Sequence, residues 1–321
     1  LVPDTAHGTN PASCTIAGFE TVNIPSGPEG FLKASTLKEH LDGDTAALMI
    51  TNPNTLGIFE QEIREIADAL HTNGSYLYMD GANLNALLGV ARPGDMGVDC
   101  MHVNLHKTFA TPHGGGGPGS GPVLVRKDLA PYLPFPLITQ DESGSYVLSG
   151  EHESSVGMVH GYLGNVSVCL KALAYILSLG PESLSSVSKT ACLNANYLKS
   201  RLKKLFDLPY ATPTLHEFVL SDKNLKDSGI TTMHIAKALI DSGFHPPTVY
   251  FPLVVPGALM IEPTETETLE ELDRFIEAME TIADAAGTDP DSLKGAPLSS
   301  PVTHVDEVLA ARHLILTWHG I

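Results

Sequence analysis

The chain has 321 residues, of which 43% are hydrophobic and 17% charged, a composition typical of a globular protein with one large and one smaller domain. Its 37 acidic and 19 basic residues give a net charge of −18, which disfavours non-specific binding to nucleic acid. Four scattered cysteines form no Cys-x-x-Cys pair, which indicates a reducing compartment and excludes a zinc ribbon or a disulfide scaffold.

No targeting or membrane segment is visible. The most apolar window, 163–180, contains Asn165 and Lys171, so it is typical of a buried or amphipathic helix. The chain opens on Leu1-Val2-Pro3 without a signal or transit peptide and without methionine. We therefore expect a truncated or processed product, cytoplasmic by default, or mitochondrial if eukaryotic, with any targeting segment upstream.

Strand and helix signals alternate through the first half, as in an α/β protein. Asn10-Pro11 predicts the start of a helix, because asparagine caps helices and proline suits their first turn. The expected strands are 20–24, 46–50, 76–79, 98–103 and 123–126, and the expected helices are 35–41 and 60–72.

The second half differs in its pattern. Two long helices are expected at 155–179 and 182–206, separated by Gly180-Pro181. Further strands are predicted at 216–220, 248–255 and 258–261, and further helices at 231–242, 264–286 and 306–312. This order predicts a large domain over 1–180 and a smaller α+β domain over 181–321.

The segment around Lys107 is the least ordinary part of the chain. Lys107 is expected in a strand-to-loop turn, followed by six glycines between residues 114 and 121. A flexible linker is one interpretation, but the apolar strands on both sides favour a loop whose backbone approaches another group closely. A dinucleotide fingerprint would open a helix, and a P-loop lysine would follow the glycines, so both are excluded.

Polar residues follow three successive predicted strands: Thr51 and Asn52, then Asp80, then His106 and Lys107. Functional groups in open α/β sheets gather at the carboxyl ends of strands. We therefore expect these side chains to converge.

A lysine in an apolar turn can react with carbonyls, and a Schiff base with pyridoxal phosphate would need a carboxylate near the pyridine nitrogen, phosphate donors and a wall on each ring face. Asp80 would supply the carboxylate, although a helix cap is an equally good interpretation of Asp80 alone. Ala82 is small enough to let a ring lie close, or is an ordinary helix alanine. His106 would stack or hydrogen-bond near the cofactor.

Three histidines, His102, His106 and His113, offer a metal site as another interpretation of this segment. His-x3-His presents both ligands on one face of a helix, whereas this segment is predicted as strand and glycine loop. No Cys/His cluster completes a site, so we expect no metal.

Five stretches together make the chain resemble the P-proteins of the glycine cleavage system, which are pyridoxal-phosphate-dependent glycine decarboxylases, in their C-terminal catalytic portion. The stretches are Ala6–Ser13, Thr51–Gly57, Met79–Asn83, Asn104–Phe109 with the glycine run, and Ile261–Glu267. Residues 306–318 resemble the family's C-terminal tail. The resemblance implies an α/β fold of the fold-type-I pyridoxal-phosphate transferase class.

The same resemblance implies roles for individual residues. Lys107 would bind the cofactor covalently and Asp80 would face its pyridine nitrogen, while His7, Thr9, Asn10, Thr51 and Asn52 would lie around cofactor and substrate. Glycine would lose its carboxylate as carbon dioxide, and the aminomethyl group would pass to the lipoyl arm of the H-protein. The enzyme would thus be an oxidoreductase that acts on a lipoyl disulfide, paired with a sister P-protein subunit or half.

A family segment that supplies phosphate donors and ring-stacking contacts would lie upstream of Leu1. We therefore expect this polypeptide alone to bind pyridoxal phosphate weakly or not at all. Two alternatives stay open: another fold-type-I decarboxylase or aldolase, and a non-catalytic P-protein-like partner, which retention of Lys107 and Asp80 disfavours. The acidic helix 264–286 is either a solvated face or a pairing surface.

Overall fold

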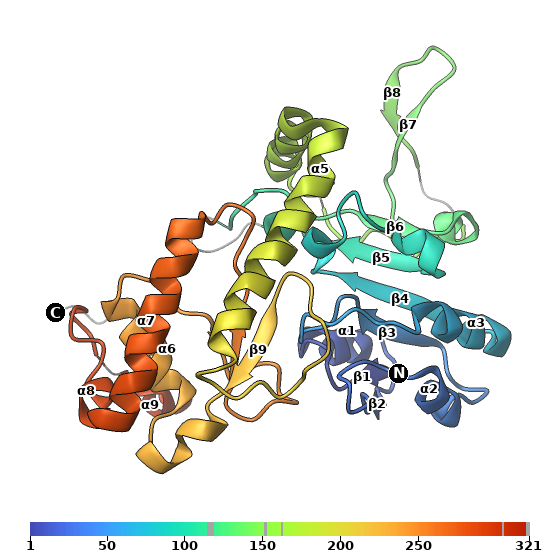
Figure 1. The fold of residues 1–321 in the computed structure, drawn as a ribbon. Coiled ribbons are helices and arrows are strands. Elements are labelled where there is room, and N and C mark those ends of the chain that lie inside the picture. The colour runs from blue at the N-terminus through green and yellow to red at the C-terminus, as the bar shows by residue number, and fades with distance from the viewer. Residues whose placement is uncertain (114–118, 151–152, 162, 304, 319–321) are drawn as a thin grey trace.

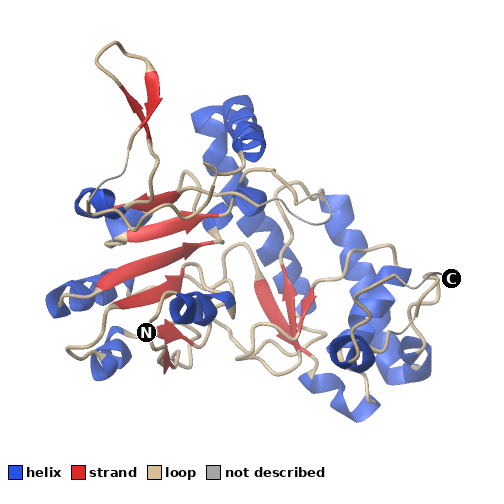
Figure 2. Cartoon of the chain, turned by 180° about the vertical axis from the view of Figure 1, so that it is seen from behind, coloured by secondary structure: helices blue, strands red, loops and turns tan. Residues whose placement is uncertain are grey.

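The computed structural model describes residues 1–321 except 114–118, 151–152, 162, 304 and 319–321. Among the described residues, no helix combines the length and the apolar character needed to cross a membrane. The first half builds one open sheet with helices packed around it, and the second half builds a smaller sheet covered by the C-terminal helices (Figures 1 and 2).

The larger sheet has the order β3-β4-β5-β6. Strands β3, β4 and β5 are parallel and β6 is antiparallel to β5. The register pairs Thr51 with Asp80 and Asp80 with His102, so polar residues of three strands meet at one edge. The strands are β3 (Ala47–Thr51), β4 (Tyr76–Gly81), β5 (Cys100–Val103) and β6 (Val123–Val125).

Helices α1 (Thr9–Ile16), α2 (Ala34–His40) and α3 (Ile63–Asn73) accompany this sheet. Apolar residues of α3 recur at helical spacing, and its Ile66, Ala67 and Leu70 are buried in the first core. A short parallel pair, β1 (Val2–Pro3) and β2 (Asn23–Ile24), lies beside β3. The predicted α/β fold with a mostly parallel sheet is thus observed.

The smaller sheet is antiparallel, in the order β10-β11-β9, and forms a second core with the C-terminal helices. The acidic helix α7 has a regular apolar face, including Phe275 and Met279, that packs into this core. The elements are β9 (Phe218–Ser221), α6 (Thr232–Asp241), β10 (Thr248–Val249), β11 (Ala258–Ile261), α7 (Leu269–Thr288), α8 (Pro290–Lys294) and α9 (Glu307–Arg312).

Helix α5 (Val166–Leu202) joins the two parts: its first half packs on the first core and its second half on the second. Gly180 interrupts it with φ 70° and ψ 168°, a conformation that favours glycine. The expected break is confirmed, but α5 starts at 166, not at 155, because the chain turns at Gly157 and Gly164, both with positive φ. The domain boundary at 180 stays a prediction.

Several expected boundaries were wrong. The strand 248–255 ends at Val249, because Tyr250 has φ 56° and Pro252 has no N–H to donate. The predicted helix 264–286 begins only at Leu269, where the Thr268 side chain caps the N–H of Glu271. The strand 20–24 shrinks to β2, and Gly8, not Asn10, precedes the first turn of α1.

A hairpin of β7 (Ile138–Gln140) and β8 (Tyr146–Leu148) projects away from the rest of the chain (Figure 1). Its strands are exposed throughout. It lies far from the carboxyl edge of the larger sheet and plays no part in the site described below.

Candidate active site

A cavity of about 810 Å³ opens at the carboxyl edge of the larger sheet. Its wall combines residues of α1, the ends of β3 to β5 and the second half of the chain. This volume is within the usual range for sites that bind small molecules and cofactors. The predicted residues that line it are His7, Thr9, Asn10, Thr51, Asp80, Ala82 and Lys107.

Lys107 lies on α4 (Leu105–Thr108), a single turn of helix directly after β5. The predicted turn is therefore helical, with the backbone N–H groups of Lys107 and Thr108 bonded to the carbonyl of Asn104. Leu105 and Thr108 are buried beneath it, whereas Lys107 is exposed to the cavity. The turn thus presents the amine to the cavity from a fixed base.

Asp80 is 5% exposed and lies one residue before the end of β4. Its Oδ1 accepts hydrogen bonds from the N–H of Ala82 at 2.9 Å and from His102 Nε2 at 3.1 Å. Burial alone would raise the pKa of Asp80, but the hydrogen bonds from His102 and Ala82 and the charges of His102 and Lys107 together lower it. Asp80 is thus a buried carboxylate held ionised.

His102 completes this arrangement, although the sequence suggests it only as a metal ligand. Its Nδ1 lies 2.9 Å from the Tyr78 hydroxyl, and its Nε2 faces Asp80. The ring thus bridges Tyr78 and Asp80, with its Nε2–H as the donor to the Asp80 carboxylate. The alternation of side chains along β4 and β5 could have indicated that His102 shares a face with Asp80.

Helix α1 closes another side of the cavity. Asn10 Nδ2 lies 3.4 Å from Thr51 Oγ1, which in turn lies 3.4 Å from Asp80 Oδ2. His7 packs its ring against Phe251 with centroids 5.2 Å apart. Residues distant in sequence therefore gather around Asp80, as the positions of the strand ends predicted.

Two predicted site residues lie elsewhere. Asn52 is fully buried and bonded to the N–H of Glu60 through its Oδ1, so it does not line the cavity. His106 stacks on His113 with centroids 3.9 Å apart and also lies outside the lining. Burial and the charges of His113 and Lys107 lower the pKa of His106.

Of the glycine run, the structure describes residues 119–121 but not residues 114–118. Gly121 approaches β5 so closely that a Cβ would overlap the carbonyl oxygen of Val103. The close approach to β5 thus explains why residue 121 is a glycine. The other prediction, that the glycine run packs beside Lys107, falls on residues that are not described.

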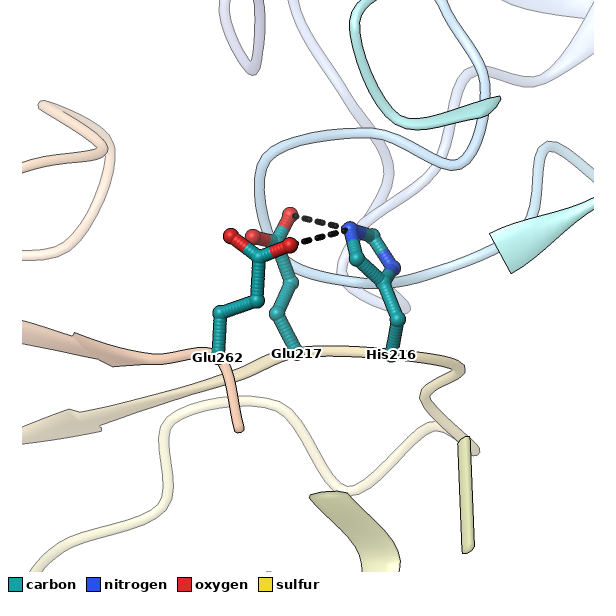
Figure 3. A group of neighbouring side chains, drawn as sticks. All are labelled: His216, Glu217 and Glu262. Atoms are coloured by element: carbon teal, nitrogen blue, oxygen red, sulfur yellow. Dashed lines mark ion pairs between the residues drawn. The ribbon is translucent and has the colours of Figure 1, made fainter. Parts of the chain in front are cut away.

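The second half of the chain adds three residues that sequence reasoning missed: His216, Glu217 and Glu262 (Figure 3). Glu217 and Glu262 line the cavity that also holds Lys107, and His216 is buried behind them. Asn83 Nδ2 donates to Glu217 Oε1 at 3.1 Å, and Asn85 Nδ2 donates to Glu262 Oε1 at 3.0 Å. The only signal in the sequence was the resemblance at 261–267, which assigned no role to Glu262.

The residues around the cavity fit pyridoxal phosphate. An exposed amine on a rigid turn, an ionised buried carboxylate and a small side chain at Ala82 are the groups that this cofactor needs. Within the described part of the chain, no hydrogen bond or ion pair occupies the Lys107 amine. Thr9, at the start of α1, lines the same cavity.

Two family models match the chain. One, described as the C-terminal domain of glycine dehydrogenase, matches residues 187–291, and the other, class-V aminotransferases, matches residues 9–137. The aminotransferase match ends beyond Lys107 and includes Asp80. The glycine dehydrogenase match includes Glu217 and Glu262.

Curated relatives match almost the whole chain. A probable glycine dehydrogenase (decarboxylating) subunit 2 of Chlorobium chlorochromatii is 55% identical over 98% of this chain and 66% of its own length. The corresponding protein of Shouchella clausii is 53% identical over 99% of this chain and 65% of its own length. The chain thus spans just under two thirds of these relatives.

Solved structures support the fold. Glycine decarboxylase (P-protein) of the glycine cleavage system, in inhibitor-bound form, has a TM-score of 0.72 at 22% identity and covers 88% of this chain, which spans 64% of that one. Sphingosine-1-phosphate lyase of Burkholderia pseudomallei has a TM-score of 0.66 at 16% identity, over 91% of this chain and 64% of its own. The predicted fold-type-I class is therefore confirmed.

Proposed function

The chain belongs to the family of glycine dehydrogenase (decarboxylating) subunit 2, and on this premise we propose that it carries the catalytic lysine of a pyridoxal-phosphate-dependent glycine decarboxylase. The observation that carries this proposal is the meeting of Lys107 and the ionised Asp80 in one cavity. The aminomethyl group left after loss of carbon dioxide would pass to the lipoyl arm of an H-protein.

Each residue would contribute through its position. Lys107 would hold the cofactor covalently and would be displaced by the amino group of glycine. Asp80 would keep the pyridine nitrogen protonated, and His102 with Tyr78 would fix the orientation and charge of Asp80. Bound pyridoxal phosphate supplies an electron sink for the electron pair that the departing carboxylate leaves behind. Ala82, His7, Thr9, Asn10 and Thr51 would shape the cavity around both ligands.

The remaining assignments are also proposals. His106 and Asn52 would act on the site from outside the cavity lining. The bacterial origin of the relatives supports a cytoplasmic location, and the subunit number in their names supports pairing with a sister subunit. Their names also favour this activity over a different fold-type-I decarboxylase or aldolase.

The test measures release of labelled carbon dioxide from carboxyl-labelled glycine by the full-length protein with its sister subunit, cofactor and lipoylated H-protein. We expect activity that depends on the H-protein and that falls to background in Lys107→Ala. Lys33→Ala is the matched control, because Lys33 is a partly exposed lysine outside the cavity. Undiminished release by Lys107→Ala would contradict the assignment, and release from other amino acids but not glycine would favour a different decarboxylase.

A further inference from the structure

The cluster of His216, Glu217 and Glu262 brings one imidazole ring and two carboxyl groups together (Figure 3). His216 has no exposed surface, and neither of its ring nitrogens has a hydrogen-bond partner among the described residues. A buried polar atom without a partner costs free energy, so such atoms usually mark a place where another group binds. Its Nε2 points at the two carboxyl groups.

The protonation states rule out a closed ion-pair network. Burial lowers the pKa of His216 to about 3, so its ring is neutral near pH 7. Nε2 lies 3.7 Å from Glu217 Oε1 and 3.8 Å from Glu262 Oε1, distances too long for hydrogen bonds. The neutral ring therefore offers one free acceptor beside two carboxyl groups.

The two carboxyl groups are similarly uncompensated. Burial raises the pKa of Glu217, helped by the charge of Glu262, and burial also raises the pKa of Glu262. The Glu262 side chain is 43% exposed, and it lines the open cavity. The positive charge of Lys107 opposes both shifts, yet neither carboxylate is paired with Lys107. A cation bound between them would supply the missing charge.

The spacing of the acceptors suits an ammonium group. The three ligand atoms all lie within 4.8 Å of one another. Two sides of this triangle are 3.7 Å and 3.8 Å and the third is at most 4.8 Å, so its centre is within about 2.5 Å of each atom. A nitrogen outside the plane of the triangle can therefore reach all three atoms at the ~2.8 Å of a charge-assisted hydrogen bond. A primary ammonium has three N–H donors for three acceptors. Tetrahedral zinc, with bonds of about 2.0–2.2 Å, would require the cluster to contract.

The location supports the same ligand. Glu217 and Glu262 line the cavity that contains Lys107, and a small molecule in that cavity can reach both groups. Asn83 and Asn85, on the segment that follows Asp80, hold the two carboxyl groups in place through hydrogen bonds. Each Oε1 keeps a second lone pair for a ligand.

We infer that His216, Glu217 and Glu262 form a receptor for the primary ammonium group of the amino acid substrate, beside Lys107. Its identification with glycine rests on the proposed function, but the receptor for a primary amine does not. After binding, one N–H bond would break and the proton would pass to a carboxylate oxygen, while the lone pair stays on nitrogen. The neutral amine so produced is the form that can attack a carbonyl carbon. The raised pKa of Glu217 favours this proton transfer.

The test uses methylammonium as the probe and saturation-transfer NMR on the full-length protein prepared without cofactor, so that the probe cannot react with it. We expect methylammonium to bind, and tetramethylammonium, which has the same charge but no N–H donor, to bind at least about tenfold more weakly. Glu217→Gln and Glu262→Gln should each weaken methylammonium binding about tenfold or more. Glu39→Gln is the matched control, because Glu39 is exposed on α2 outside the cavity.

The Lys107 side chain also carries a primary ammonium group that could occupy the cluster. The Lys107→Ala variant distinguishes binding of the substrate ammonium from binding of Lys107. A substrate receptor should bind methylammonium with similar affinity in wild type and in Lys107→Ala. Binding seen only in Lys107→Ala would show that the cluster holds the lysine and would overturn the inference. Equal binding of both cations, no binding in either protein, or stoichiometric zinc binding that needs the same three residues would also overturn it.

The variants keep the test interpretable. Glutamine matches the shape of glutamate, and its side-chain oxygen can still accept from Asn83 or Asn85, so thermal unfolding should change little. Because Glu262 faces the open cavity, its variant remains informative even where Glu217→Gln is unstable. Intact methylammonium binding without glycine decarboxylation would contradict the proposed function alone, whereas decarboxylation without binding would contradict the receptor alone.

Discussion

The charge on Asp80 depends on neighbours that can be removed one at a time. His102 Nε2 donates to Asp80, and the Tyr78 hydroxyl holds the other side of the ring. His102→Leu should therefore raise the pKa of Asp80, and the acid limb of the pH profile of kcat/KM should move to higher pH. Asp80→Asn should lower kcat at all pH values by on the order of 10²-fold.

Tyr78→Phe is the matched control for His102→Leu, because it keeps the aromatic ring and the contact with Asp80 through His102. We expect a smaller shift of the acid limb in Tyr78→Phe. An unchanged pH profile in His102→Leu would show that His102 does not set the charge of Asp80.

The buried carboxyl group of Glu60 makes the free energy of unfolding of the protein depend on pH. It is fully buried, accepts hydrogen bonds from the N–H of Leu32 and from Asn54 Nδ2, and burial raises its pKa to about 7. A carboxyl whose pKa is higher in the folded state contributes stability below its unfolded value of about 4.5 and loses it as the pH rises to about 7. That contribution is on the order of 3 kcal/mol.

The measurement is urea unfolding of wild type and Glu60→Gln at several pH values between about 4.5 and 8. The free energy of unfolding of wild type relative to Glu60→Gln should fall as the pH rises through this range. Gln at this site also loses an acceptor, which shifts the difference by a constant and leaves its slope unchanged. A difference that stays constant with pH would contradict the assignment.

At the scale of elements, most of the site that can be predicted from the sequence lies at the ends of β3, β4 and β5. Parallel strands bring their carboxyl ends together, so the sequence alone predicts that Thr51, Asp80 and Lys107 lie in one site. Asn52 directly follows Thr51 at the end of β3, but its side chain accepts a hydrogen bond from the N–H of Glu60 and does not line the cavity. The order of the strands alone could not indicate this. Glu217 and Glu262 come from the second sheet, and no local pattern encodes contacts 134 and 177 residues apart.

The turn at Gly57 positions Glu217 and can be tested with one substitution. Gly57 has φ 74°, its carbonyl accepts from the N–H of Leu215, and a Cβ would overlap the carbonyl oxygen of Glu217. Gly57→Ala should destabilise the protein by more than the ~1–3 kcal/mol of backbone strain alone and should displace Glu217 from the cavity.

Gly74→Ala is the matched control. Gly74 also has positive φ, at 83°, but a Cβ there would meet no atom within 4 Å. Thermal and urea unfolding should show a clearly larger loss for Gly57→Ala than for Gly74→Ala. Equal losses of stability in the two variants would mean that backbone strain alone, and not the contact with Glu217, explains why residue 57 is a glycine.

Across the whole molecule, the site lies between two parts that each have a core of their own and that share a third apolar cluster. The first core includes Leu48, Leu77 and Val103, and the second includes Phe218, Ile261 and Met279. Hydrogen bonds from Asn83 to Glu217 and from Asn85 to Glu262 cross between them at the cavity. Lys107 comes from one part and the proposed ammonium receptor from the other, so both parts are needed for the chemistry that we propose.

Lys199 is the alternative candidate against which the assignment of Lys107 as the catalytic lysine can be tested. Lys199 is buried, and burial with the charge of Lys203 lowers its pKa, which is also expected of a carbonyl-reactive amine. It donates to the carbonyl of Thr212 and to Thr214 Oγ1 and does not line the cavity. The position of Lys107 in the cavity, rather than its burial, therefore distinguishes the two lysines.

The most direct measurement is reduction of the full-length protein with borohydride in the presence of pyridoxal phosphate and its sister subunit, followed by peptide mass spectrometry. We expect one phosphopyridoxyl group per chain, on Lys107, and none in Lys107→Ala. A modification on Lys199 or another lysine, or no modification in a protein that releases carbon dioxide from glycine, would contradict the assignment of Lys107 as the catalytic lysine.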